Sequence, residues 1–174
     1  MAGEEASEAR LAFVDISVFA DGSIRGGVLV TDIVTRPYEF RVTTPVKPTA
    51  MQRVLYGNTL ADYVYGELIG VPLVRAIKEK LSLVICKNEK LIIMRPQLDI
   101  PVVVISKTGQ DIRSDKPEEA FSTLSFKAHS SYSGEEEWAR ALLTELIGKQ
   151  DAFEPFDRLR TAMDEVHKQK IGSQ

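Results

Sequence analysis

Alternating apolar and polar positions, together with a turn signal, predict three strands in the first quarter of the chain. Residues 11–20 alternate in part, and the turn signal Asp21-Gly22-Ser23 separates them from a second apolar run over residues 24–32. Within that run, Gly26-Gly27 marks a bulge or a close approach of another part of the chain. Residues 38–43 then place apolar side chains on one face and Glu39, Arg41 and Thr43 on the other. Consecutive strands with short connections predict an antiparallel meander.

A helical region follows the third strand and extends to about residue 80. Two prolines end strand pairing, and Thr49 with Gln52 has the spacing of a capping box. Glycine ends helices and proline suits their first turn, so we expect breaks at Gly57-Asn58 and at Gly70-Val71-Pro72. The region is therefore predicted as two or three helices.

Two apolar runs without alternation follow, over residues 81–86 and 99–105. Unbroken hydrophobicity is typical of strands buried on both faces, as in parallel sheets with helical crossovers. Asn88 begins a short helix between the two runs. The alternative is a hairpin that turns across Lys87 to Lys90. The preferred prediction is an α/β (α+β) fold with a mixed five-stranded sheet, in which the meander is followed by α-β-α-β.

The last third of the chain is predicted as a loop, a peripheral strand and two helices. Residues 108–119 are polar and rich in turn formers, and residues 121–129 alternate. Ser133 and Glu136 have capping-box spacing, and Pro155 opens the final helix. We expect the two helices to form an antiparallel pair joined by residues 149–154. The side chains expected to pack together are Trp138, Leu142, Leu146, Phe156, Leu159 and Met163.

The chain of 174 residues suits one domain that buries its own core. We assign residues 1–10 to a flexible N-terminus and residues 169–174 to a flexible tail. Residues 11–168 are the single α/β domain. It divides into a sheet core (11–105), a loop with a peripheral strand (106–132) and C-terminal helices (133–168).

The element order over residues 11–105 resembles that of the ribonuclease-H-like fold, in which the first strand is central and pairs in parallel with the fourth. The resemblance is one of topology and rests on no sequence motif. It implies carboxylates on the first strand, on the first helix and at the end of the fourth strand, where they hold divalent metals. Asp15 and Glu67 match the first two positions, but the fourth strand ends in Cys86-Lys87-Asn88-Glu89. Because a lysine opposes a metal ion there, we expect no nuclease activity.

Composition and charge exclude several classes of protein. With 44% hydrophobic and 27% charged residues the chain is globular, and its net charge of −3 argues against a surface that is basic throughout. Cys86 is the single cysteine, so no internal disulfide and no multi-cysteine zinc site can form. No apolar run approaches the roughly 20 residues that span a bilayer. The acidic start lacks an apolar signal stretch, so we expect a cytoplasmic protein without a membrane partner.

The strongest functional signal is a basic strand-to-helix junction over residues 35–56. Its candidate binding residues are Arg36, Arg41, Lys47, Thr49 and Arg53. Basic side chains beside a helix start suit an anion or a nucleic-acid backbone, so both are expected partners. The alternative is a solvated edge strand whose arginines are neutralised by acids of the chain.

Asp15 is the most unusual acid, because it lies among apolar strand residues and burying an unpaired carboxylate is costly. Its structural explanation is an ion pair with Arg25 or Arg41, or an exposed face. His129 and His167 lack partners at ligand spacing, and no phosphate-loop motif is present, so we predict no metal and no cofactor. The sequence thus predicts a non-catalytic binding module. The alternatives are a metal-dependent nuclease that uses Asp15 and Glu67, and a structural homo-oligomer built through the C-terminal helices.

Overall fold

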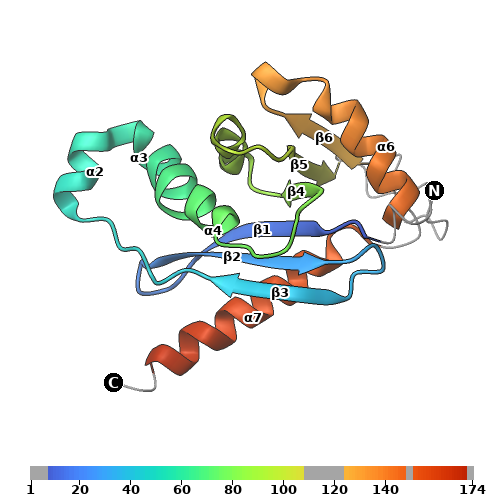
Figure 1. Cartoon of the computed structure of the whole chain (residues 1–174). Coiled ribbons are helices and arrows are strands. Elements are labelled where there is room, and N and C mark those ends of the chain that lie inside the picture. The colour runs from blue at the N-terminus through green and yellow to red at the C-terminus, as the bar shows by residue number, and fades with distance from the viewer. Residues whose placement is uncertain (1–7, 108–123, 148–150, 172–174) are drawn as a thin grey trace.

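The protein is described by a computed structural model that covers residues 8–107, 124–147 and 151–171. It contains six strands in one mixed sheet (Figure 1). The strands are β1 (Leu11–Val18), β2 (Ile24–Thr31), β3 (Pro37–Val42), β4 (Leu83–Cys86), β5 (Val102–Lys107) and β6 (Leu124–Ala128). The fold is therefore mixed α/β as predicted, with one strand more than the five expected.

The strand order in the sheet is β3-β2-β1-β4-β5-β6. β1, β2 and β3 form the predicted antiparallel meander. β4 pairs in parallel with β1, from Leu11 opposite Leu83 to Val14 opposite Cys86, and β5 pairs in parallel with β4. The parallel crossover is confirmed and the hairpin alternative is wrong. The sixth strand, β6, is the predicted peripheral strand and lies antiparallel to β5.

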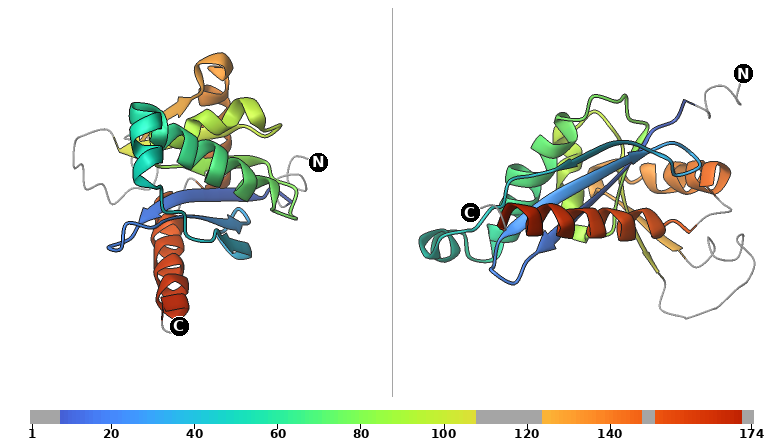
Figure 2. Two further views of the ribbon diagram at one scale, coloured as in Figure 1. Left: turned by 90° about the vertical axis from the view of Figure 1, so that its left-hand side faces the viewer. Right: turned by 90° about the horizontal axis from the view of Figure 1, so that it is seen from below.

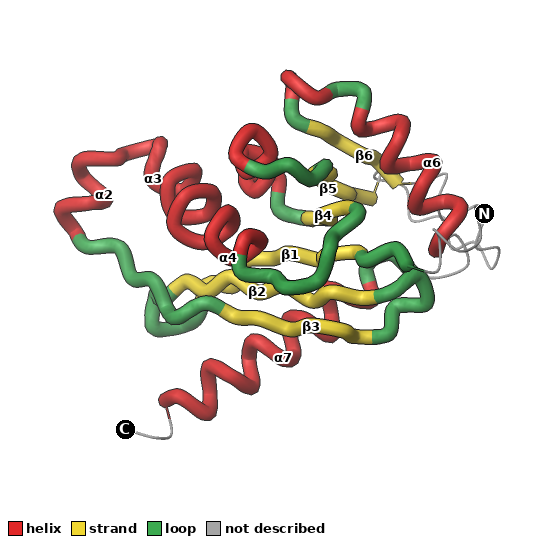
Figure 3. Tube along the Cα trace, viewed as in Figure 1, coloured by secondary structure: helices red, strands yellow, loops and turns green. Residues whose placement is uncertain are grey.

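The helical region between β3 and β4 is more continuous than predicted (Figure 3). Its elements are α2 (Ala50–Tyr56), η1 (Gly57–Thr59), α3 (Leu60–Asp62), the π-helix η2 (Tyr63–Gly70) and α4 (Val71–Arg75). Thr49 and Gln52 form the predicted capping box, and Gly57 ends α2 with a φ of 51°. The break expected at Gly70 is wrong, because η2 continues directly into α4.

The remaining helices lie in the second half of the chain. They are η3 (Glu89–Gln97), η4 (Ser130–Tyr132), α6 (Glu135–Ile147) and α7 (Glu154–Ile171). The Asn88 side chain accepts a hydrogen bond from the Lys90 backbone and caps η3 as predicted. The Glu136 carboxylate accepts a hydrogen bond from the backbone N–H of Ala128, which ties the first turn of α6 to the end of β6.

Helices cover both faces of the sheet, and each face has its own core (Figure 2). Alternate β1 residues separate the cores. Leu11 and Phe13 face α6 and α7, whereas Ala12 and Val14 face η2, α4 and η3. Gly26-Gly27 allows helices to approach β2 closely from both sides. A Cβ at Gly26 would lie 2.1 Å from Ile69 Cγ2, and one at Gly27 would lie 2.6 Å from Met163 Sδ. The strand register is unbroken at both glycines, so the close approach explains them rather than a bulge.

The C-terminal helices do not form the predicted pair around Trp138, although Leu142 packs against the core that contains Phe156, as predicted. α6 packs on β5 and β6, whereas α7 packs on β1 and β2. Trp138 is 45% exposed, and among the α6 side chains that the structure describes, Ala139 and Leu143 are buried. The predicted α7 stripe is confirmed, since Phe156, Leu159 and Met163 are buried. The pairing was wrong because each helix packs its apolar face on the sheet instead of on the other helix.

Some predicted segments lie outside the described residues. They are residues 1–7 of the N-terminus, the loop over 108–119, residues 121–123 of the peripheral strand and residues 172–174 of the tail. Among the helices that the structure describes, none combines the length and the apolar character required to cross a bilayer.

Candidate functional site

The first two arginines of the basic junction are engaged by acids of the chain. Arg36 Nε lies 3.1 Å from Asp32 Oδ2, and Arg41 Nε donates to the Glu39 carboxylate. Glu39 also accepts a 2.9 Å hydrogen bond from the backbone N–H of Lys78. Burial opposes ionisation of Glu39, but the hydrogen bonds outweigh it and lower the pKa of the carboxyl. These contacts match the structural alternative for both arginines.

The other junction residues lie beyond the far end of β3. The Thr49 hydroxyl accepts from the Gln52 backbone at 3.1 Å and is therefore committed to capping α2. Lys47 and Arg53 are exposed. Arg36 precedes β3 and Lys47 follows it, so the strand separates them. The junction is thus spread along the strand, and anion binding by the whole set stays a prediction.

Asp15 lies on the β1 face that α7 covers, and its side chain is only 12% exposed. Lys87 Nζ is 3.8 Å from Asp15 Oδ2, and the Arg160 charge on α7 acts on the same carboxylate. Desolvation by burial raises the pKa of Asp15, against a hydrogen bond from Ile16 and the two positive charges. The partner expected from the sequence, Arg25, instead donates from Nε to His167 Nδ1 at 3.0 Å.

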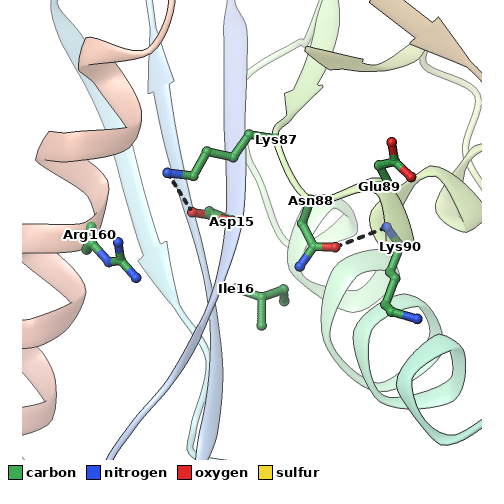
Figure 4. Close-up of a pocket in the computed structure, with 7 residues that line it drawn as sticks. All are labelled: Asp15, Ile16, Lys87, Asn88, Glu89, Lys90 and Arg160. Atoms are coloured by element: carbon green, nitrogen blue, oxygen red, sulfur yellow. Dashed lines mark hydrogen bonds and ion pairs between the residues drawn. The ribbon is translucent and has the colours of Figure 1, made fainter. Parts of the chain in front are cut away.

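A hollow of about 550 Å³ opens beside Asp15, where β4 ends at Cys86 while β1 continues to Val18. We call it the edge pocket. It is lined by Asp15, Ile16, Lys87, Asn88, Glu89, Lys90 and Arg160. Figure 4 shows Lys87 and Arg160 on the Asp15 side of β1, with Asn88, Glu89 and Lys90 on the other side. Clefts at the carboxyl ends of parallel strands are common ligand sites in α/β sheets.

Separate parts of the chain build the edge pocket. Lys87 is the first residue after β4, and Phe156, whose ring centroid lies 5.7 Å from Lys87 Nζ, belongs to α7. Arg160 is one turn further along the same helix. From the sequence, Lys87 was expected only to oppose a metal ion, and Arg160 was not predicted as a site residue. Arg160 lies beside the apolar stripe predicted for α7, and this position was the signal in the sequence that could have identified it. Using this signal requires knowing which strand α7 covers.

Glu67, the second acid of the nuclease alternative, does not line the edge pocket. It is exposed on η2, and its charge acts on Tyr56, which stacks on Tyr63 with ring centroids 4.4 Å apart. Within residues 8–107, 124–147 and 151–171, no three His, Cys, Asp or Glu side chains are grouped to hold a metal ion.

No protein-family model and no curated protein matches the chain. Among solved structures, the chain is similar to endonuclease V from Ciona intestinalis in complex with an inosine-containing 23-mer DNA. The identity is 8% and the TM-score 0.35, over 61% of this chain and 48% of that one. A second complex of endonuclease V from the same organism, with a 24-mer DNA, gives 8% identity and a TM-score of 0.33, over 62% and 49%. The chain spans about half the length of these structures, and similarity at this level establishes no family.

Proposed function

We propose that the protein is a non-catalytic binding module, and that the edge pocket binds an anionic group such as phosphate. The observation that carries the proposal is the convergence of Lys87 and Arg160 on one hollow beside the buried Asp15. The lining residues carry three bases and two acids, a formal charge of 3 − 2 = +1, in a chain of net charge −3. Glu89 Oε2 also lies 3.8 Å from Lys127 Nζ, which reduces its repulsion of an anion.

Each of these side chains has a distinct role. Lys87 and Arg160 are the principal contacts, because a flexible ammonium and a forked guanidinium suit phosphate oxygens. Asp15 lies 3.8 Å from the Lys87 ammonium and partly offsets its positive charge, so it limits how strongly the pocket attracts an anion. Lys90, across β1, adds positive potential at the rim. A buried carboxylate destabilises a fold, and such groups concentrate at functional sites.

The nuclease alternative has weaker support. Two-metal phosphoryl transfer requires several oxygen ligands around the same cations. In the edge pocket the ammonium of Lys87 lies beside Asp15, and the second lining acid, Glu89, is 71% exposed and directed at Lys127. This donor set suits an anion better than a divalent cation. The strand order β3-β2-β1-β4-β5, with β1 and β4 parallel, supports our proposal that the topology is ribonuclease-H-like.

Isothermal titration at low salt with inorganic phosphate, nucleotides and short oligonucleotides tests the proposal. We expect saturable binding that falls steeply in the Lys87→Ala, Arg160→Ala double variant and weakens as salt screens the charges. Asp15→Asn should strengthen binding, because it removes a repulsive charge while keeping the shape of the side chain.

The matched control is Lys47→Ala, which removes an exposed cation of the basic junction and leaves the edge pocket intact. Binding retained in this control and lost in the double variant supports the edge pocket. The proposal is wrong if none of the three probes binds saturably. It is also wrong if Lys47→Ala abolishes binding while the double variant retains it, since the anion site would then be the junction.

A further inference from the structure

A second hollow, of about 320 Å³, lies beside α2 and is lined in part by residues of η1, α3 and η2. We call it the α2 pocket. Most of its lining is apolar: Ile24, Pro48, Leu60, Ala61, Val64 and Tyr65. Val64 is only 2% exposed and Pro48 is buried, so the floor belongs to the folded core rather than to a loose surface. Small-molecule sites are typically concave and apolar, with a few polar groups that fix the ligand's orientation.

Arg53 supplies such a polar group at the rim of the α2 pocket, together with Asn58. Arg53 is exposed, whereas Arg36 and Arg41 are each ion-paired to an acid. Within the part of the chain that the structure describes, no carboxylate lies within 4.0 Å of the Arg53 guanidinium. Its fork of N–H donors is therefore available to a ligand beside an apolar hollow.

We infer that the α2 pocket binds a small amphipathic anion, with an apolar ring or chain in the hollow and its acidic group on Arg53. A volume of about 320 Å³ is at the lower end of the roughly 300–1,000 Å³ of ligand pockets, so the ligand is compact. Apolar burial supplies affinity, and the charge-assisted hydrogen bonds of Arg53 select a carboxylate, sulfonate or phosphate.

This site is independent of the edge pocket. The two hollows share no lining residue. They also differ in chemistry: the lining of the edge pocket is mostly charged, whereas the α2 pocket joins an apolar floor to one free cation. Either site can therefore fail without the other.

A matched pair of fluorescent probes tests the inference. The compound 8-anilino-1-naphthalenesulfonate carries a sulfonate on an apolar ring system, and N-phenyl-1-naphthylamine has the same rings without the charge. We expect saturable binding of the sulfonate. In Arg53→Gln its affinity should fall by at least about tenfold, which is the usual effect of losing a hydrogen bond to a charged group. Arg53→Lys should retain most of the affinity, and binding of the uncharged probe should not change.

Two further variants locate the bound probe. Ala61→Leu fills the hollow and leaves Arg53 in place, so it should abolish binding of both probes. Lys80→Ala removes an exposed cation outside both pockets and should bind both probes as the parent does. Circular dichroism and thermal melting check that each variant is folded, and Arg53→Gln keeps the test valid if Ala61→Leu does not fold. The inference is refuted if sulfonate affinity is the same in parent and Arg53→Gln, or if both probes weaken equally in Arg53→Gln.

Discussion

Replacing Gly27 with alanine tests how closely α7 packs on β2. Gly27 lies under α7, and the added Cβ would be 2.6 Å from Met163 Sδ, 2.9 Å from Met163 Cγ and 3.0 Å from Leu159 Cδ1. Favourable contacts between nonbonded carbon atoms lie at roughly 3.5–4.0 Å, so the Met163 side chain must move by about 1 Å. Met163 is fully buried between Leu29 and Leu159, which leaves it little space to move.

The magnitude follows from two opposing effects. Overpacking a buried site typically costs about 1–3 kcal/mol. Replacing glycine with alanine also restricts the unfolded chain, which offsets about 0.4–1 kcal/mol. The flexible thioether of Met163 absorbs part of the clash. We therefore expect Gly27→Ala to lower the free energy of unfolding by about 1–2 kcal/mol.

A double-mutant cycle gives the sharper test. Met163→Ala alone should cost about 2–5 kcal/mol, because it leaves a cavity above Gly27. In the double variant the new methyl group occupies that space, so the two effects should not add. Urea unfolding of all four proteins measures the coupling, which we expect at about 1–3 kcal/mol in favour of the double variant. Additive effects, within about 0.5 kcal/mol, would refute the close approach of α7 to β2.

Three other predictions concern α6, Asp15 and Cys86. Leu143→Ala should cost about 2–5 kcal/mol in urea unfolding, and Trp138→Ala under about 1 kcal/mol, because only Leu143 is buried; equal costs would contradict the α6 orientation. Folding raises the pKa of Asp15, mainly by desolvation, so the folded protein favours the protonated carboxyl. The contribution of Asp15 to the free energy of unfolding is therefore present below pH 3.8 and is lost as the pH rises through the folded pKa. Asp15→Asn should therefore stabilise the protein at neutral pH and lose that advantage below pH 3.8, whereas a pH-independent difference would disprove the burial effect. Burial raises the pKa of the Cys86 thiol, so a thiol reagent should label it only when the protein unfolds; rapid labelling of the native protein would refute this.

Much of the sheet was predictable because its signals are local. Alternation, partial in the first strand and full in the third, and a turn signal before the second strand predicted the meander. The unbroken apolar run that ends at Cys86 indicated a strand buried on both faces. The α7 stripe through Phe156, Leu159 and Met163 was equally clear, since one helix face has to be buried whatever covers it.

The orientation of α6 and the candidate sites depended on contacts that no local pattern contains. Trp138 and Leu143 both suit a buried helix face, and the decision came from the position of α6 over β5 and β6. The convergence of Lys87 and Arg160 near Asp15 required α7 to lie across β1. Side chains far apart in the sequence meet only when packing has chosen one arrangement of the elements. Local patterns were therefore enough to predict the strands and the buried stripes, whereas the packing of α7 on the sheet decided which charges share a pocket.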